Sequence, residues 1–154
     1  MSLVAIFCFI LWIQTNDSLG TPIKPEGCAT TLCCENCDDL RVTSIIDGDT
    51  FNSTSGKVRL FGIDAPEKGE PCFIEAKNRL TKLASSSVRV EEGPRAQDRY
   101  GRLLFYTYTD QGESIDEIMV TEGLARAWTI DGQHANILKM AEADAKNSST
   151  GCIW

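Results

Sequence analysis

The stretch "SIIDGDTF", Ser44–Phe51, places two aspartates around a glycine inside a β-branched, apolar run. The surrounding residues alternate over Arg41–Thr54, which predicts a strand, and Asp47-Gly48 is a turn dipeptide that bends it. Arg41–Thr54 is long enough to supply two strands of a small barrel. A turn explains Asp47, but it explains Asp49 less well, because Asp49 lies past the glycine where strand propensity favours other residues.

Further strands are expected where short apolar or β-branched runs lie between turn residues: Lys57–Ile63, Val88–Glu92, Leu103–Thr109 and Leu124–Ile130. The prolines of "DAPEKGEP" (64–71) and the polar composition of "GPRAQDRYGR" (93–102) predict loops there.

Three helices are expected. Pro71–Ala84 has apolar residues at helical spacing, with Pro71 suited to the first turn. Ser114-Ile-Asp-Glu117 is a capping box that opens a short helix ending at Gly123, and Ala135–Lys146 forms the last helix. The expected class is mainly β with α (α+β), and five short strands with a helix after the third suit a small closed barrel.

Composition is that of an ordinary folded domain, with 42% hydrophobic and 24% charged residues in 154. The net charge is −7, and Met1–Leu40 holds five acids and one base, so the remainder carries −3. An acidic domain disfavours bulk electrostatic binding of nucleic acid, which needs clustered Lys and Arg. It leaves room for a local basic site or for a bound cation.

Residues 1–20 carry an apolar run, Leu3–Ile13, of the length of a signal-peptide core, followed by the small residues Ser18 and Gly20 at cleavage-site spacing. This predicts an exported protein, either secreted or located in the periplasm or at the cell surface. Because no Lys or Arg precedes the run, an uncleaved membrane anchor stays an alternative.

Residues 21–39 are expected to be a Cys-rich linker, with the folded domain over Leu40–Trp154. Four cysteines crowd the linker: Cys28, Cys33, Cys34 and Cys37. His134 is the only histidine, so a four-thiolate zinc site is the one zinc interpretation left, and an oxidising compartment favours local disulfides instead. The sequence does not give their connectivity.

Asp49, Asp64 and Glu67 are hard oxygen donors with no Cys or His beside them, which favours calcium or magnesium over a soft metal. The alternative is that these acids only bond their own loop backbone. Arg59, between Val58 and Leu60, either points outward from its strand or offers its planar fork to a phosphate. Arg102 follows Tyr100-Gly101 in a loop, where it is either a solvated charge or a second phosphate contact.

The motifs "IIDGDTF", "VRLFGIDAPE", "DRYGRLL" and "SIDEIMVTEGLA", in this order and at these spacings, closely resemble the staphylococcal nuclease (thermonuclease) family, as does the closing "GCIW". The resemblance covers about Leu40 to the end. It implies a five-stranded oligonucleotide-binding (OB) barrel with three helices. It also implies calcium-dependent hydrolysis of DNA and RNA phosphodiesters that leaves 3′-phosphate ends.

By the family pattern, Asp49 and Asp64 bind Ca²⁺ with the backbone carbonyl of Ala65, and Glu67 activates the attacking water. Arg59 and Arg102 hold the phosphate and stabilise transition-state charge, and Arg99 and Tyr100 are expected to contact the substrate. A disulfide between Cys72 and Cys152 is expected to tie the C-terminal tail to the first helix. A monomer without a protein partner is expected.

The sequence departs from the family at several positions. Ala65 replaces a common threonine, Asp116 stands where asparagine often begins the second helix, and Thr129 and Asp131 occupy the positions of base-stacking tyrosines, with Trp128 adjacent. The sequence therefore does not predict the base preference, nor whether DNA or RNA is the preferred substrate. His134 is expected on the surface at a helix start.

Two rival functions remain. One is a non-catalytic nuclease-like barrel that binds nucleic acid or protein, and the other is a disulfide-rich surface or adhesion protein. The presence of Asp49, Arg59, Asp64, Glu67 and Arg102 favours the enzyme.

Overall fold

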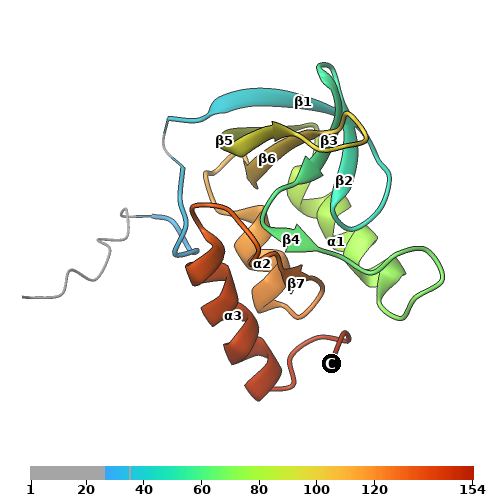
Figure 1. The fold of residues 1–154 in the computed structure, drawn as a ribbon, viewed down its shortest axis with the longest axis vertical. Helices are drawn as coiled ribbons and strands as arrows, with labels where there is room; N and C mark the ends of the chain where they lie inside the picture. The colour runs from blue at the N-terminus through green and yellow to red at the C-terminus, as the bar shows by residue number, and fades with distance from the viewer. Residues whose placement is uncertain (1–26, 35) are drawn as a thin grey trace, which may run out of the picture.

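The computed structural model describes residues 27–34 and 36–154, so the predicted signal or anchor segment 1–20 lies outside the described residues. Five strands close a barrel in the order β1-β2-β3-β6-β5 (Figure 1). Their bounds are β1 Asp38–Ile45, β2 Thr50–Ser53, β3 Gly56–Leu60, β5 Ser87–Gln97 and β6 Leu103–Tyr108. The remaining elements are β4 Ile63–Asp64, β7 Arg126–Ala127, α1 Phe73–Ala84, α2 Ile115–Thr121 and α3 Ala135–Asn147. The expected five-stranded OB barrel with three helices is confirmed.

The bend in the first long segment divides Arg41–Thr54 into β1 and β2, as the turn dipeptide predicts. Asp49 N donates to Asp47 Oδ1 at 3.1 Å, which makes Asp47 a turn residue. A Cβ on Gly48 would lie 2.7 Å from the Cβ atoms of both Ala65 and Ala76. Gly48 is therefore required because α1 and the loop before it pack directly on the bend.

Three strand predictions are wrong. The expected strand Lys57–Ile63 is interrupted at Phe61 and Gly62, so that β3 ends at Leu60 and Ile63 belongs to β4. The segment expected to loop from Gly93 continues β5 as far as Gln97, and Pro94 is tolerated because the pairing with β6 is irregular between Glu92 and Gln97. Leu124–Ile130 supplies only the two residues of β7, which pairs with β4 outside the barrel. Its apolar residues pack beside the helices instead of extending a sheet.

The first residues of α1 and the cap of α2 differ in detail from the predictions. α1 begins at Phe73, with Cys72 as its N-cap at a positive φ of 71°, so Pro71 precedes the helix instead of sitting in its first turn. Ser114 caps α2 as expected by accepting a bond from Glu117 N at 3.1 Å. The carboxylate of Glu117 does not return to the cap. It accepts bonds from Thr31 N and Leu32 N at 2.8 and 2.7 Å.

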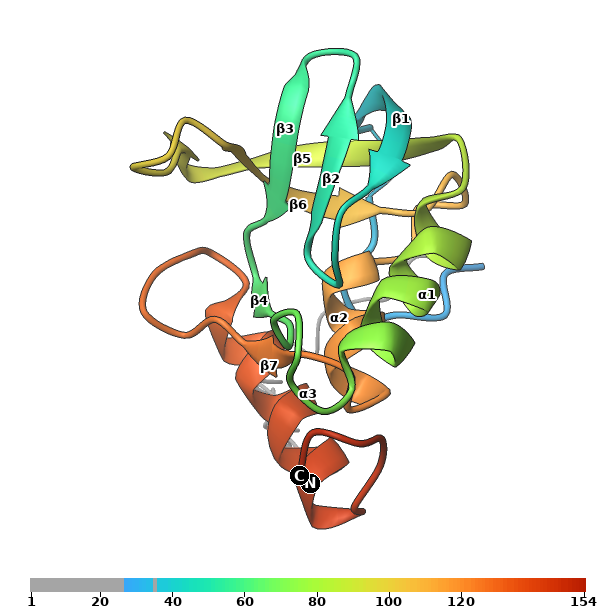
Figure 2. The same ribbon diagram turned by 90° about the vertical axis from the view of Figure 1, so that its right-hand side faces the viewer.

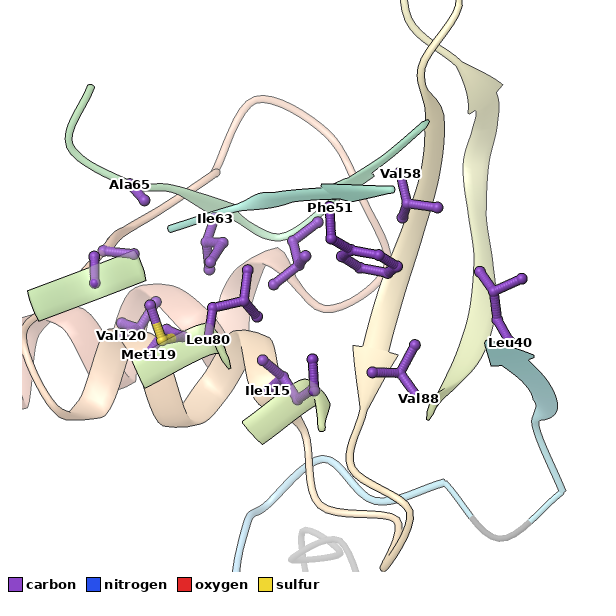
Figure 3. Close-up of a cluster of buried hydrophobic side chains, with 14 residues drawn as sticks. Leu40, Phe51, Val58, Ile63, Ala65, Leu80, Val88, Ile115, Met119 and Val120 are labelled. Atoms are coloured by element: carbon purple, nitrogen blue, oxygen red, sulfur yellow. The ribbon is translucent and has the colours of Figure 1, made fainter. Parts of the chain in front are cut away.

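The main core lies between the barrel and the first two helices. Figure 3 shows Phe51 and Val58 from the strands facing Leu80 and Ile115 from the helices, and all four are fully buried. Truncating such a residue to alanine costs about 2–5 kcal/mol. Figure 2 shows α1 and α2 side by side beneath the barrel, so this core fixes the loop that joins β4 to α1.

The cysteine-rich segment packs against the domain. Cys28 pairs with Cys33 and Cys34 with Cys37, so these four thiols form two disulfides and no zinc site. Leu32 between them is buried, and Glu117 holds its backbone. The segment expected to be a linker thus bonds to α2 at Thr31 and Leu32, and Cys28 contacts the loop before α2 at Gly112.

His134 lies at the start of α3, as expected, but it is not a surface residue. Its ring packs edge-on against Tyr106, with the centroids 4.6 Å apart, and its Nε2 lies 2.9 Å from Glu91 Oε2. Gln133 and the hydroxyl of Tyr108 donate to the same carboxylate. This cluster joins α3 to the barrel.

Candidate active site

The two predicted metal ligands lie next to one arginine. Arg59 Nη2 is 2.7 Å from Asp64 Oδ1 and 3.4 Å from Asp49 Oδ2, and Arg59 Nη1 donates to the carbonyls of Leu60 and Ile63. The Arg59 side chain is only 14% exposed. The Arg59 side chain therefore does not point into solvent. It lies across the end of β3, where it contacts both Asp49 and Asp64.

Asp49 is held by the loop that follows β4. Its Oδ2 accepts a bond from Ala65 N at 3.0 Å, and its Oδ1 accepts from the hydroxyl of Thr50 at 2.7 Å. Asp49 is buried, whereas the Asp64 side chain is 59% exposed. The bend at Gly48 and the loop at Ala65 thus place one fixed and one open carboxylate at the same end of the barrel.

Glu67 lies on the same loop, largely exposed, and the negative charges of the other acids act on its carboxylate. Partial burial raises the pKa of Glu67, and the negative charges of Asp47, Asp49 and Asp64 raise it further. Burial together with the charge of Asp49 likewise raises the pKa of Asp47. One arginine therefore faces several mutually repelling carboxylates, an arrangement that attracts a cation.

Arg102 is positioned by an acid that the sequence analysis did not single out. Asp98 accepts bonds from Arg102 Nε at 2.6 Å, from Arg102 N at 3.0 Å and from Tyr100 N at 2.8 Å. Burial acts to raise the pKa of Asp98, but these bonds outweigh it and the net pKa is lowered. The "DRYGR" turn thus positions Arg102 through its own Asp98. The sequence signal for this is an Asp four residues before an Arg within a turn.

The predicted site residues line two adjoining hollows. Arg59 and Arg102 share a pocket of about 430 Å³ with Tyr100 and Trp128, and Arg102 and Tyr100 share a second hollow with Glu67. Tyr100 is 67% exposed, and the guanidinium groups of Arg99 and Arg102 lie 4.7 and 5.5 Å from its ring centre. The structure therefore brings all the predicted arginines and Tyr100 to the end of the barrel that carries the acids.

The far wall of the 430 Å³ pocket depends on Arg95, which the sequence did not indicate, and on the segment 128–131 that replaces the family's base-stacking tyrosines. Asp131 accepts a bidentate pair of bonds from Arg95 at 2.6 and 3.2 Å and a bond from Trp128 Nε1 at 2.8 Å. The bonds from Arg95 lower the pKa of Asp131. Trp128 lies 5.8 Å from the guanidinium carbon of Arg59. Asp131 thus holds together the two segments that flank Arg59.

The oxygen atoms of Asp49, Asp64 and the Ala65 carbonyl are the candidate ligands for a divalent cation. In residues 27–34 and 36–154, no three His, Cys, Asp or Glu side chains are grouped so as to hold an ion by themselves. Two carboxylates near one arginine, with a backbone carbonyl at Ala65, suit a hard ion that completes its shell with water and substrate oxygens. The residues present therefore fit a calcium- or magnesium-type site and do not fit zinc.

The fold and the site together define an OB-barrel nuclease, with acids and arginines gathered at one mouth of the barrel. The family model described as "Staphylococcal nuclease homologue" matches residues 57–154. The chain is 33% identical over 157 residues to "Endonuclease YncB" of Bacillus subtilis (strain 168), which covers 92% of this chain and 70% of that protein.

It is 32% identical over 136 residues to the "Thermonuclease" of Staphylococcus hyicus, covering 81% of this chain and 77% of that protein. It is 38% identical over 127 residues to the "Micrococcal nuclease" of Shigella flexneri, covering 73% and 71%. The chain belongs to the staphylococcal nuclease family and is a hydrolase that acts on nucleic acid.

Proposed function

We propose that the protein is an exported, calcium-dependent endonuclease that hydrolyses DNA and RNA and leaves 3′-phosphate ends. One observation carries the proposal: Arg59 joins Asp49 to Asp64 at the mouth that Glu67 and Arg102 also line. A binding module could use the two arginines to hold a phosphate, but it would have no need for carboxylates beside them.

The phosphodiester anion is placed against the two arginines. The guanidinium groups of Arg59 and Arg102 neutralise its charge. Arg102 donates to the equatorial oxygens, more strongly as negative charge builds up there, and Arg59 Nη2 would join it once Asp49 and Asp64 turn to the ion. Arg102 is held for this role by Asp98 and Arg59 by carbonyl oxygens, so neither group must be ordered at the moment of reaction. This is electrostatic preorganisation.

Glu67 takes the proton of the attacking water. The water oxygen bonds to phosphorus, the bond from phosphorus to the 5′ oxygen breaks, and that oxygen leaves and takes a proton from solvent, to which Glu67 then releases the proton it accepted. The product strand keeps a 3′-phosphate. General-base assistance of this kind contributes about 10²–10⁴-fold.

Asp49, Asp64 and the Ala65 carbonyl would hold the ion. A bound calcium ion supplies positive charge that offsets the phosphate and lowers the pKa of nearby water. Calcium suits an irregular, loop-built site with carbonyl and water ligands better than magnesium, which demands near-octahedral geometry. The ion would also relieve the repulsion among the acids around Glu67.

Export is supported by the three disulfides, because such bonds persist in oxidising compartments. Within residues 27–34 and 36–154, no helix has the length and apolar character needed to cross a bilayer. Whether the N-terminal segment is cleaved is tested by the intact mass of the mature protein.

The proposal is tested by incubating the protein with single-stranded DNA and with RNA in calcium, in magnesium and in EGTA. We expect cleavage of both substrates in calcium, none in EGTA, and ends that a 3′-phosphatase converts to 3′-hydroxyl. Full cleavage in EGTA, or 5′-phosphate ends, would overturn the proposal.

A further inference from the structure

A second cavity lies against the acids and is not lined by Trp128. It has a volume of about 530 Å³ and shares Asp64 and Ala65 with the site, and Arg126 and Trp154 line its other wall. The polar pair Arg59–Asp64, 2.7 Å apart, separates it from the 430 Å³ pocket, because Arg59 lines one and Asp64 the other. The two cavities therefore adjoin at the Arg59–Asp64 pair, where we place the phosphate.

The wall of this cavity that contains Trp154 is fixed by a disulfide and by hydrogen bonds. The C-terminal tail runs back from α3 to lie under the loop before α1 (Figures 1 and 2), and the Cys72–Cys152 disulfide, which the resemblance implies, ties it there. Cys152 N donates to Gly123 O at 3.2 Å, and Trp154 Nε1 donates to Thr150 O at 2.6 Å. Trp154 is thus held in place at the end of the chain.

The cavity offers the two groups that bind single-stranded nucleic acid. Trp154 is 37% exposed, and the ring face that Arg126 does not cover could stack on a base. The guanidinium carbon of Arg126 lies 5.6 Å from the ring centre, and Arg126 is exposed and able to contact a phosphate. Glu70 also lines this cavity, so Arg126 supplies the cationic contact on an otherwise acidic wall.

An endonuclease must hold nucleotides on both sides of the phosphate that it cleaves. We propose that Arg126 and Trp154 form a second nucleotide subsite, which binds the strand on the side of the scissile phosphate opposite to Tyr100 and Trp128. The proposal rests on the proposed placement of that phosphate at Arg59 and Asp64. It assigns the C-terminal tail and its disulfide a role in substrate binding.

The test uses single-stranded DNA in which one phosphodiester is flanked by slowly cleaved phosphorothioates, so that the strand keeps its charge and has one cleavage point. The strand is extended by three nucleotides on the 5′ side or on the 3′ side. Steady-state kcat and KM are measured for the wild type, Arg126→Ala, Arg126→Lys and Trp154→Phe. Arg41→Ala, which removes an exposed arginine at β1, is the matched control.

In the wild type we expect extension on each side to lower KM. Arg126→Ala is expected to raise KM about threefold or more for one extension series only, with kcat changed less, because a stacked base and a phosphate contact contribute to binding alone. Arg126→Lys should restore part of the effect, Trp154→Phe should keep most of the stacking, and Arg41→Ala should match the wild type. Circular dichroism and thermal melts establish that each variant is folded.

A folded Arg126→Ala protein with wild-type KM in both series would overturn the subsite, as would an equal rise in both. Failure of the proposed function is distinguishable, because the wild type would then cleave none of the strands in calcium.

Discussion

Two groups of carboxylates in this protein lie in opposite surroundings. Asp116 at the start of α2 is fully buried, and its oxygens accept bonds from Gly62 N, Thr107 N and the Thr107 hydroxyl at 2.8, 2.9 and 3.0 Å. The adjacent Glu117 accepts two backbone N–H groups of the N-terminal segment. These acids are satisfied by the backbone, and they join segments that are distant in sequence.

The acids at the mouth of the barrel are satisfied differently. Asp49 and Asp64 share one guanidinium, Asp64 is mostly exposed, and the pKa of Glu67 is raised by burial and by the neighbouring negative charges. The proposed cation and phosphate would relieve this repulsion. Acids bonded by backbone N–H groups stabilise the fold, whereas acids grouped around one guanidinium are the ones we propose to serve the ligand.

The largest effect should come from an arginine at the mouth. Arg102→Ala is expected to lower kcat/KM by about 10²–10⁴-fold with unchanged thermal stability, because it removes charge stabilisation at the phosphate. Arg99→Ala, three residues away, is the matched control and should change KM by about threefold or less, since Arg99 is held beside Tyr100 at the exposed rim. Equal losses in both variants would contradict the division of roles within "DRYGR".

The opposite outcome is expected at the buried acids. Glu117→Ala should lower the free energy of unfolding by about 1–3 kcal/mol, because Leu32 N is buried and loses its acceptor. Hydrogen exchange over residues 28–34 should rise, while kcat on single-stranded DNA stays unchanged. Glu75→Ala, at an exposed position of α1, is the control for loss of a carboxylate. A loss of kcat with unchanged stability would contradict a purely structural role.

Asp116 should make stability depend on pH. Burial raises its pKa to about 6, against the lowering effect of its hydrogen bonds, so the folded state keeps a proton that the unfolded state releases near pH 4. The stabilising contribution is complete below about pH 4 and is lost as pH rises through about 6, at up to about 1.4 kcal/mol per pH unit. Urea unfolding at pH 4.5, 5.5 and 6.5 should show that Asp116→Asn flattens this decline. Parallel curves for the two proteins would contradict it.

The smallest effect is expected at the wall of the nucleotide pocket. Asp131→Asn weakens the bonds to Arg95 and Trp128, which are partly exposed, so KM for single-stranded DNA should rise about two- to fivefold with kcat little changed. Lys139→Ala, at an exposed position of α3, is the control for a surface charge. A fall in kcat without a change in KM would show that Asp131 acts on the chemistry instead.

Sequence reasoning succeeds where the determining residues are local. The bend at Asp47-Gly48, the cap at Ser114 and the acids of "GIDAPE" are each read from short stretches, because turn and cap chemistry involve neighbours in the chain. The placement of the arginines at the same mouth came from the resemblance of several motifs in order. No single motif would have predicted it.

Long-range contacts explain what was missed. The Arg95–Asp131 pair joins residues 36 apart, and Arg95 lies in the part of β5 past Gly93 that the polar composition predicted to be a loop. Glu117 bonds the cysteine-rich segment at a separation of 85 residues, so a capping motif could not reveal its second partner. Such pairings depend on the closed barrel and on helix packing, which local patterns do not specify.

The most direct test of the account compares Glu67→Gln with Glu70→Gln on a single-stranded DNA substrate in calcium. Both variants are expected to fold as the wild type does. Turnover should fall by about 10²–10⁴-fold in Glu67→Gln, because the water loses its base, and should stay within about threefold in Glu70→Gln. Undiminished turnover in a folded Glu67→Gln protein would contradict the central claim that Glu67 activates the attacking water.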